Sequence, residues 1–258
     1  MSLFSIAAKK LKNYLSKEEV ELRRLVRVPR YTSCKTTLLN GIELADSLSF
    51  VAGYEEIFRR ENYKADFENP KPFIIDCGSN IGLSIIYFKN NFPDATIIGF
   101  EPDPSIFQIL KRNTQRFNNI TLHNKALGAE KKKLSFISEG GFSGRVKEDA
   151  TGSNVIEVDI EPLSTYIDRD IDLLKIDIEG AEYEVLKEVQ PLLQRVKKLF
   201  IEYHSVDKTE QNLDLILVLL KKEGYRVHIK EAYTAKHPFI DIPLMAGMDN
   251  QLEIYANR

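Results

Sequence analysis

Residues 73–82, FIIDCGSNIG, decide the fold of this chain. The apolar run that ends in an acid predicts a short buried strand, and the glycines after it frame a turn into a helix. Gly78 permits a tight turn with positive φ, Asn80 tolerates the left-handed conformation, and Gly82 lets the next helix pack closely on the strand. Such strand–helix turns bind ligands beyond the carboxyl ends of open α/β sheets.

Strands and helices alternate after this turn. Further strands are predicted at residues 96–100, 120–124, 172–178, 199–203, 225–229 and 252–256, and helices at 82–91, 104–117, from about 180, and 213–222. Residues 133–160 read as an insertion with strands at 134–137 and 155–160 around a glycine-rich loop. Apolar strands that alternate with helices require a mostly parallel sheet covered on both faces. The prediction is an α/β domain with a seven-stranded, mostly parallel sheet.

The first 70 residues follow a different pattern. Helical periodicity is present at 5–27 and at 52–62, and residues 37–44 resemble a hairpin that turns at Asn-Gly. Prolines at 70 and 72 interrupt the chain. We therefore expect a mostly helical extension over residues 1–70 and the main domain over residues 71–258. Residues 1–30 hold eight Lys and Arg against three Glu, which suits a solvated helix or a segment that docks on an anionic lipid surface or an acidic carrier.

Composition excludes several classes of protein. A net charge of −2 over 258 residues argues against a dedicated nucleic-acid binder. The two cysteines, Cys34 and Cys77, form no spacing pattern, which favours a reducing, cytoplasmic compartment. No apolar run is long enough for a transmembrane segment, and no basic residues precede the apolar start as in a signal peptide. A homo-oligomer is compatible with the sequence, which leaves the oligomeric state open.

Acidic residues beside the glycine turn indicate the ligand. A dinucleotide site has Gly-x-Gly-x-x-Gly, whereas this turn has Gly-x-x-x-Gly with Asp76 two positions before it. An acid there suits a cationic ligand better than a pyrophosphate. Glu101 follows the second strand and can accept both hydroxyls of a ribose, while Asp103 is placed to cap the next helix. The pattern predicts a site for an adenosine that carries a positive charge.

Residues 171–182, IDLLKIDIEGAE, together with residues 75–82 and 100–102, closely resemble the FkbM family of methyltransferases. Residues 124–128 and 201–204 also fit the pattern of that family, so the resemblance covers about residues 73–204. It implies a Rossmann-like class I methyltransferase fold that uses S-adenosylmethionine. Most members of the family are O-methyltransferases that act on natural products, sugars or glycolipids.

The resemblance also implies roles for individual residues. The cofactor-binding set would be Asp76, Gly78, Ser79, Asn80 and Gly82 around the methionine part, Glu101 and Pro102 at the ribose, Lys125 and Ala126 beside the adenine, and Asp177 at the transfer site. Ser79 stands where many relatives carry alanine. Glu179 would face the transfer site beside Asp177. The implied acceptor is a hydroxyl of a small molecule or of a glycan- or lipid-linked compound.

Polar side chains at two strand ends are candidates for the catalysis. Asp177 and Glu179 are two residues apart, as are Glu202 and His204, so each pair is expected to point to one side of its strand. Buried strands are normally apolar, so these residues require a functional reason. Methyl transfer requires the acceptor oxygen to lose a proton, and we predict that His204 or Asp177 accepts it. For Lys175, a salt bridge to Asp177 or Glu179 is expected.

Alternatives remain at this stage. The carboxylates and His204 are ligands of a type that magnesium accepts, but nothing in their spacing demands a metal, and none is expected. A NAD-dependent oxidoreductase or epimerase on a similar sheet is a second possible class, which the glycine spacing disfavours. A scaffold that binds the cofactor without catalysis is a third, which the presence of Asp177 and His204 disfavours. The loop at residues 138–145 suits a mobile lid over the acceptor or an exposed connection.

Overall fold

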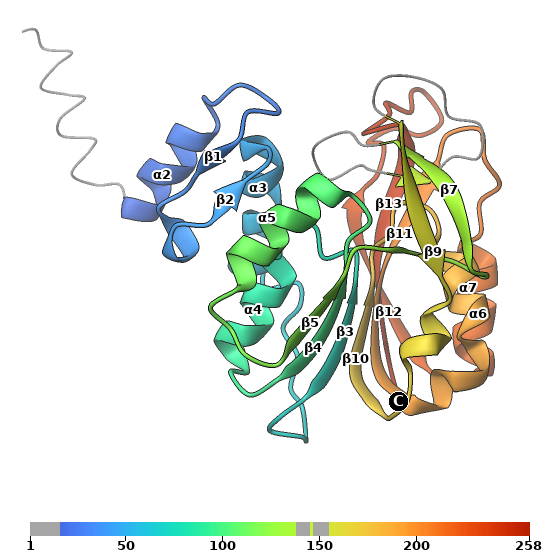
Figure 1. Cartoon of the computed structure of the whole chain (residues 1–258). Helices are drawn as coiled ribbons and strands as arrows, with labels where there is room; N and C mark the ends of the chain where they lie inside the picture. Colours follow the sequence, from blue (N-terminus) through green and yellow to red (C-terminus); the bar gives the residue numbers. More distant parts are fainter. Residues whose placement is uncertain (1–15, 138–144, 147–154) are drawn as a thin grey trace, which may run out of the picture.

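The computed structural model describes residues 16–137, 145–146 and 155–258. Its central sheet consists of β3 (Phe73–Cys77), β4 (Thr96–Phe100), β5 (Ile120–His123), β10 (Ile171–Ile176), β11 (Val196–Val206), β12 (Arg226–Tyr233) and β13 (Met248–Asn257). The strand order is β12-β13-β11-β10-β3-β4-β5 (Figure 1). The five strands from β11 to β5 are parallel, whereas β13 is antiparallel to both β11 and β12. The predicted seven-stranded, mostly parallel sheet is confirmed.

Helices cover both faces of this sheet (Figure 1). One face packs against α4 (Leu83–Asn91) and α5 (Pro104–Thr114), and the other against α6 (Glu182–Glu188), α7 (Leu213–Lys222), η3 (Leu163–Tyr166) and η4 (Gln190–Arg195). Asp103 caps α5 as predicted, because its carboxylate accepts the Ser105 amide at 2.7 Å. Strand β11 is longer than expected and carries Glu202 and His204 past the end of β10, while β13 stays paired with it as far as Val206.

The N-terminal extension packs on the α4–α5 face. It comprises α2 (Lys17–Leu25), β1 (Cys34–Lys35), η1 (Leu38–Asn40), β2 (Glu43–Leu44), α3 (Ser47–Tyr54) and the π-helix η2 (Glu55–Arg59). The helix predicted at 52–62 begins instead at Ser47, because the Asp46 carboxylate caps it through the Ser49 amide at 2.9 Å. The hairpin predicted at 37–44 is also wrong in its bounds, since its strands have two residues each and enclose η1. Leu25 and Phe50 are fully buried in a core shared with α4 and α5.

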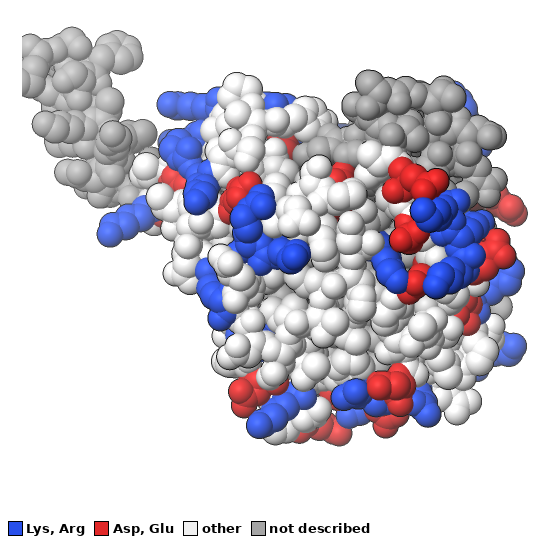
Figure 2. All heavy atoms as spheres, viewed as in Figure 1, with Lys and Arg blue, Asp and Glu red and all other residues white. Residues whose placement is uncertain are grey.

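A second, four-stranded sheet occupies the predicted insertion and also includes β6 (Ala126–Leu127), which lies before residue 133. It is formed by β6, β7 (Lys132–Ile137), β8 (Arg145–Val146) and β9 (Val155–Glu161), in the order β6-β9-β7-β8. The two strands expected at 134–137 and 155–160 are therefore confirmed. Charges of both signs alternate on the outside of this sheet (Figure 2), where Lys133 pairs with Glu157 at 2.8 Å. The glycine-rich segment predicted as a lid or connection lies mostly outside the described residues.

The topology brings four strand ends to one edge of the molecule. Strands β3, β4, β10 and β11 run parallel, so their carboxyl ends meet at the upper edge of Figure 1. The loop from β12 to β13 reaches the same edge, since β13 runs opposite to β11. Within the described ranges, no helix combines the length and the apolar character needed to cross a membrane.

Candidate active site

A cavity of about 550 Å³ opens at this edge. Such a volume falls within the range of small-molecule and cofactor sites. Its walls come from the turn after β3, the ends of β4, β10 and β11, the start of the small sheet, and the N-terminal extension. Most of the residues that the sequence singles out line it, namely Gly78, Ser79, Asn80, Glu101, Pro102, Lys125, Ala126, Asp177, Glu179 and His204.

The glycine turn has the conformation that the sequence predicts. Gly78 has φ +87° and Asn80 has φ +46°. A side chain at Gly78 would place its Cβ 1.8 Å from the carbonyl oxygen of Asp177, so only glycine lets this turn lie against the end of β10. Gly82 has φ +96°, but its close neighbours are Leu110 and Thr114 of α5. The close packing expected there is thus between helices, not between helix and strand.

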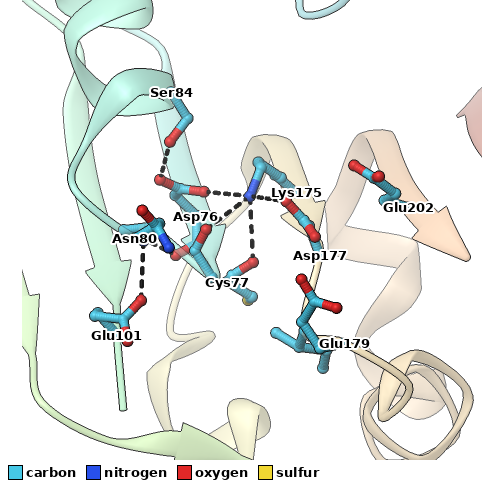
Figure 3. Close-up of polar contacts among 12 residues, drawn as sticks. Asp76, Cys77, Asn80, Ser84, Glu101, Lys175, Asp177, Glu179 and Glu202 are labelled. Carbon is cyan, nitrogen blue, oxygen red and sulfur yellow. Dashed lines mark hydrogen bonds and ion pairs between the residues drawn. The ribbon is translucent and has the colours of Figure 1, made fainter. Parts of the chain in front are cut away.

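Asp76 lies behind the cavity rather than in its wall. Its side chain is fully buried, accepts a hydrogen bond from the Ser84 hydroxyl at 2.5 Å, and pairs with Lys175 Nζ at 3.1 Å (Figure 3). Asp76 is therefore paired with Lys175 inside the protein, and its expected role toward a cationic ligand stays a prediction. Like Gly82, Asp76 does not line the cavity, and its contacts with Ser84 and Lys175 hold the turn after β3 in place.

Lys175 joins the first and fourth core strands. Its ammonium group pairs with Asp76 and with Asp177, both at 3.1 Å, and donates to the Gly78 carbonyl at 2.9 Å (Figure 3). Burial lowers the pKa of Lys175, but the two carboxylates outweigh burial and hold the pKa well above its usual value. The predicted salt bridge to Asp177 is confirmed, and its further bond to Gly78 fixes the turn.

Glu101 presents a preorganised carboxylate at the end of β4. One oxygen accepts the Asn80 amide at 3.0 Å, and the other accepts the Asp103 amide at 2.8 Å. Asn124 holds this segment by donating to the carbonyls of Glu101 and Pro102 at 2.8 and 2.9 Å. Each Glu101 oxygen keeps a second lone pair, and Glu101 is one of the residues that line the cavity. Burial raises the pKa of Glu101 to about 8.

The neighbouring part of the cavity is apolar. Phe100 and Ala126 line it and are buried, and the Phe100 ring stacks on His123 with centroids 5.1 Å apart. Lys125 also lines it, but its ammonium group is paired with Glu161 of β9. Apolar residues near Glu101 suit an adenine ring, which the resemblance places beside Lys125 and Ala126.

Four polar residues converge at the other end of the cavity. His204 Nε2 lies 3.6 Å from Glu202, 3.9 Å from Glu179 and 4.0 Å from Asp177. The predicted convergence is confirmed. For Asp177 and Glu179, however, strand alternation is not its cause. β10 ends at Ile176, and Glu179 reaches the cluster through a left-handed backbone at φ +58°. Figure 3 shows the three carboxylates around one space.

Glu182 is the functional residue that the sequence reasoning missed. Its carboxylate contacts His204 Nδ1 at 2.8 Å and also accepts the Gly180 amide at 2.9 Å. Glu182 shares the buried face of α6 with Val185 and Leu186. An acid on the apolar face of a helix next to the IDIEG run was the signal available in the sequence.

The environment of His204 determines its charge. Burial lowers the pKa of His204, but the carboxylates of Glu182, Glu202 and Glu179 outweigh burial and raise the pKa well above the usual value. For Glu179, in contrast, burial favours the neutral acid and raises the pKa to about 8. Ligand atoms of Asp177, Glu179 and His204 all lie within 4.8 Å of one another, so these three could hold a divalent cation. In the free protein the imidazolium already supplies a positive charge at this point.

The N-terminal extension forms part of the cavity wall. Arg30, Tyr31 and Glu56 line it, and Glu56 belongs to the π-helix η2, a helix type that is frequent at functional sites. Burial and the nearby carboxylate of Glu202 raise the pKa of Glu56 to about 7. Sequence reasoning assigned no residue of this segment to the site, because nothing in residues 1–70 marked them.

Fold and cavity together define a class I methyltransferase. The turn after β3, Glu101 after β4 and Asp177 after β10 line one cavity at the edge of a mostly parallel sheet. The family model described as the methyltransferase FkbM domain matches residues 76–227. The chain belongs to the FkbM methyltransferase family, which implies S-adenosylmethionine as methyl donor. This membership sets aside the NAD-dependent alternative.

Individual relatives are distant. Methyltransferase 1 of Beauveria bassiana is 29% identical over 187 residues, covering 58% of this chain and 75% of its own length. The 31-O-demethyl-FK506 methyltransferase FkbM of Streptomyces tacrolimicus is 27% identical over 216 residues, covering 67% and 81%. A crystal structure of methyltransferase FkbM from Methylobacillus flagellatus has 20% identity and a TM-score of 0.52. That match covers 78% of this chain but only 48% of the other, and it supports the fold alone.

Proposed function

We propose that this protein transfers the methyl group of S-adenosylmethionine to a hydroxyl of a small-molecule or carbohydrate-like acceptor, with His204 as the proton acceptor. The observation that carries the proposal is the His204–Glu182 contact at 2.8 Å below a cluster of cavity-lining carboxylates. It resembles the acid–histidine pair with which hydrolytic enzymes orient a general base. The relative from Streptomyces tacrolimicus, named for a 31-O-demethyl substrate, supports oxygen as the methylated atom.

The cavity fits S-adenosylmethionine at three points. Glu101 would accept the two ribose hydroxyls with the lone pairs that the Asn80 and Asp103 amides leave free. The adenine would lie beside Phe100 and Ala126. The methionine part would lie over the Gly78 turn, near Asp177. When bound, the cofactor would supply a methyl group on a positive sulfur, and the carboxylates at the end of β10 would favour the binding of that charge.

His204 accepts the proton that the acceptor hydroxyl loses. Glu182 accepts the hydrogen on Nδ1, so in the neutral ring Nε2 is free to accept a proton from the acceptor hydroxyl. Glu179 and Glu202 then stabilise the imidazolium that forms at 3.6 to 3.9 Å from them. Because the pKa of His204 is raised, neutral imidazole becomes abundant only at alkaline pH. Activity should therefore rise with pH through a midpoint above the ordinary histidine value of about 6.5.

The acceptor would enter between this cluster and the extension. Asp177, Glu202 and Glu56 line the cavity, and a polyhydroxylated acceptor could donate hydrogen bonds to their carboxyl oxygens. This wall is contributed by two parts of the chain, which gives the extension a role in substrate selection.

The test is transfer of a radiolabelled methyl group from S-adenosylmethionine to a panel of sugars and hydroxylated natural products. The wild type should label at least one hydroxyl compound. His204→Gln should lower the rate constant by about 10²- to 10⁴-fold, the usual contribution of a general base, while cofactor affinity stays unchanged. Labelling only of amines or thiols would refute the oxygen acceptor, and full activity of His204→Gln would refute the base.

A further inference from the structure

Tyr63 brings a hydroxyl group to the cavity wall without a partner inside the protein. Its side chain lines the cavity and is 8% exposed. Its ring packs edge-on against Phe200 of β11 with centroids 4.8 Å apart, and the preceding Asn62 donates to Glu253 of β13. Within the described ranges, the Tyr63 hydroxyl makes no hydrogen bond. Polar groups as buried as this one normally have a partner, so the hydroxyl is available to a ligand.

Three carboxyl groups lie at the same end of the cavity. Glu56 comes from η2, Asp177 from the end of β10 and Glu202 from β11, and all three line the cavity. Figure 3 shows Asp177 and Glu202 facing one space. Burial raises the pKa of Glu56 and of Tyr63, and the carboxylates of Glu202 and Asp177 raise both pKa values further. The groups of this cluster therefore repel one another when they are ionised.

Basic side chains of the cavity wall do not compensate Glu56. Each basic residue that lines the cavity in the described part of the chain has its own carboxylate partner: Arg30 with Asp46, Lys125 with Glu161, Lys175 with Asp76 and Asp177, and His204 with Glu182. Arg60 lowers the pKa of Glu56, but the two side chains form no ion pair among the described residues. A ligand that carries a positive charge would relieve the repulsion at this end of the cavity.

These groups also lie away from the expected cofactor contacts. The cofactor is expected at the turn after β3 and at the residues that follow β4 and β10. In the sheet, β11 lies on the opposite side of β10 from β3 and β4. Glu202 is part of β11, and the Tyr63 ring packs on that strand. A positive group bound between Glu56 and Glu202 is therefore a group of the acceptor and not of the cofactor.

We infer that the methyl acceptor carries a protonated amino group, which Glu56, Glu202 and the Tyr63 hydroxyl bind beside the hydroxyl that is methylated. The inference rests on the proposed function and narrows its acceptor to amino sugars and other amino alcohols. An ammonium group has three donors and can bridge oxygen atoms that stand apart, whereas a divalent metal ion needs its ligands within about 2.6 Å. Glu56 is not among the residues whose ligand atoms converge closely enough for a metal. The amino group also repels the imidazolium of His204 and so favours the neutral ring, which accepts the proton.

Calorimetric titration of the complex with S-adenosylhomocysteine tests the inference without methyl transfer. The probes are matched pairs in which a hydroxyl of similar size replaces the amino group: glucosamine and glucose, galactosamine and galactose, and ethanolamine and ethylene glycol. In at least one pair, the amine should bind at least about tenfold more tightly than its neutral partner, because charge-assisted hydrogen bonds are the stronger ones.

Three variants assign this preference to individual groups. Glu56→Gln should lower the affinity ratio of that pair below about threefold and leave the affinity for S-adenosylhomocysteine unchanged. Glu61→Gln removes an exposed carboxylate from the same segment and should keep the wild-type ratio. Tyr63→Phe should weaken amine binding about three- to tenfold without a loss of stability in thermal melts, since its hydroxyl makes no hydrogen bond within the described residues.

Several results would overturn the inference. They are equal or absent binding of the two members in every pair, an unchanged ratio in Glu56→Gln, or an equal loss in Glu61→Gln. Amines that displace S-adenosylhomocysteine would assign the acidic cluster to the cofactor, and magnesium that displaces the amine would assign it to a metal. A wild type that does not bind S-adenosylhomocysteine would refute the proposed function as well, whereas cofactor binding without a preference for amines refutes this inference alone.

Discussion

Replacing Glu182 with glutamine should lower the pKa of His204. The substitution keeps the size of the side chain and removes the charge that lies 2.8 Å from Nδ1. With charge centres about 4 Å apart and an effective dielectric constant of about 20, their attraction is about 4 kcal/mol, or about three pKa units. A glutamine oxygen can still accept the Nδ1 hydrogen and keeps part of this stabilisation. We therefore expect the pKa of His204 to fall by about one to three units.

Proton NMR of the imidazole rings measures this directly and needs no acceptor. The chain has four histidines, so comparison with His204→Gln assigns the resonance of His204. Glu184→Gln is the matched control, because it removes an exposed carboxylate from the same helix. An unchanged midpoint in Glu182→Gln, or an equal fall in Glu184→Gln, would refute the pairing of Glu182 with His204. The lowered pKa should also move the alkaline rise in activity to lower pH.

Three other perturbations have defined outcomes. The melting temperature of the free protein should fall as the pH rises from about 5 to 8. Glu101 and Glu179 have folded pKa values near 8, so in this range the folded state binds more protons than the unfolded state does. A melting temperature that rises over this range would contradict the prediction. Gly78→Ala should cost at least about 2 kcal/mol of unfolding free energy, from positive φ and the clash with the Asp177 carbonyl. Gly224→Ala, with positive φ but no neighbour within 4 Å, should cost less in the same urea titration. Treatment with EDTA should leave methyl transfer unchanged, because the proposed proton transfer to neutral His204 needs no cation; loss of activity that magnesium restores would make the cluster a metal site.

The main domain was predictable because its signals are local. The apolar runs of β3 and β4 and the glycine turn between β3 and α4 each specify a conformation without help from distant residues. The family resemblance then predicted most of the residues that line the cavity, because the acids that it implies directly follow strands. Where the prediction differed, a single local contact decided, as when Asp46 starts α3 five residues early.

The rest depends on contacts that sequence spacing does not reveal. The neutralisation of Asp76 by Lys175 joins residues of two strands that are neighbours only after folding. Glu182 reaches His204 across 22 positions in sequence. The extension enters the cavity through Glu56 of a π-helix, which has no simple hydrophobic period. Tertiary placement determines these roles, and local propensity says nothing about them.

Titration calorimetry with S-adenosylmethionine tests the central claim, that the cavity at the ends of β3, β4 and β10 holds an adenosine with a positive sulfur. The wild type and an exposed control, Glu130→Gln, should bind with dissociation constants in the micromolar range. Glu101→Gln should bind at least about tenfold more weakly, because an amide nitrogen replaces one of the two oxygens that accept hydrogen bonds from backbone amides and ribose hydroxyls. Equal affinity in Glu101→Gln and wild type, or no binding by the wild type, would contradict the account.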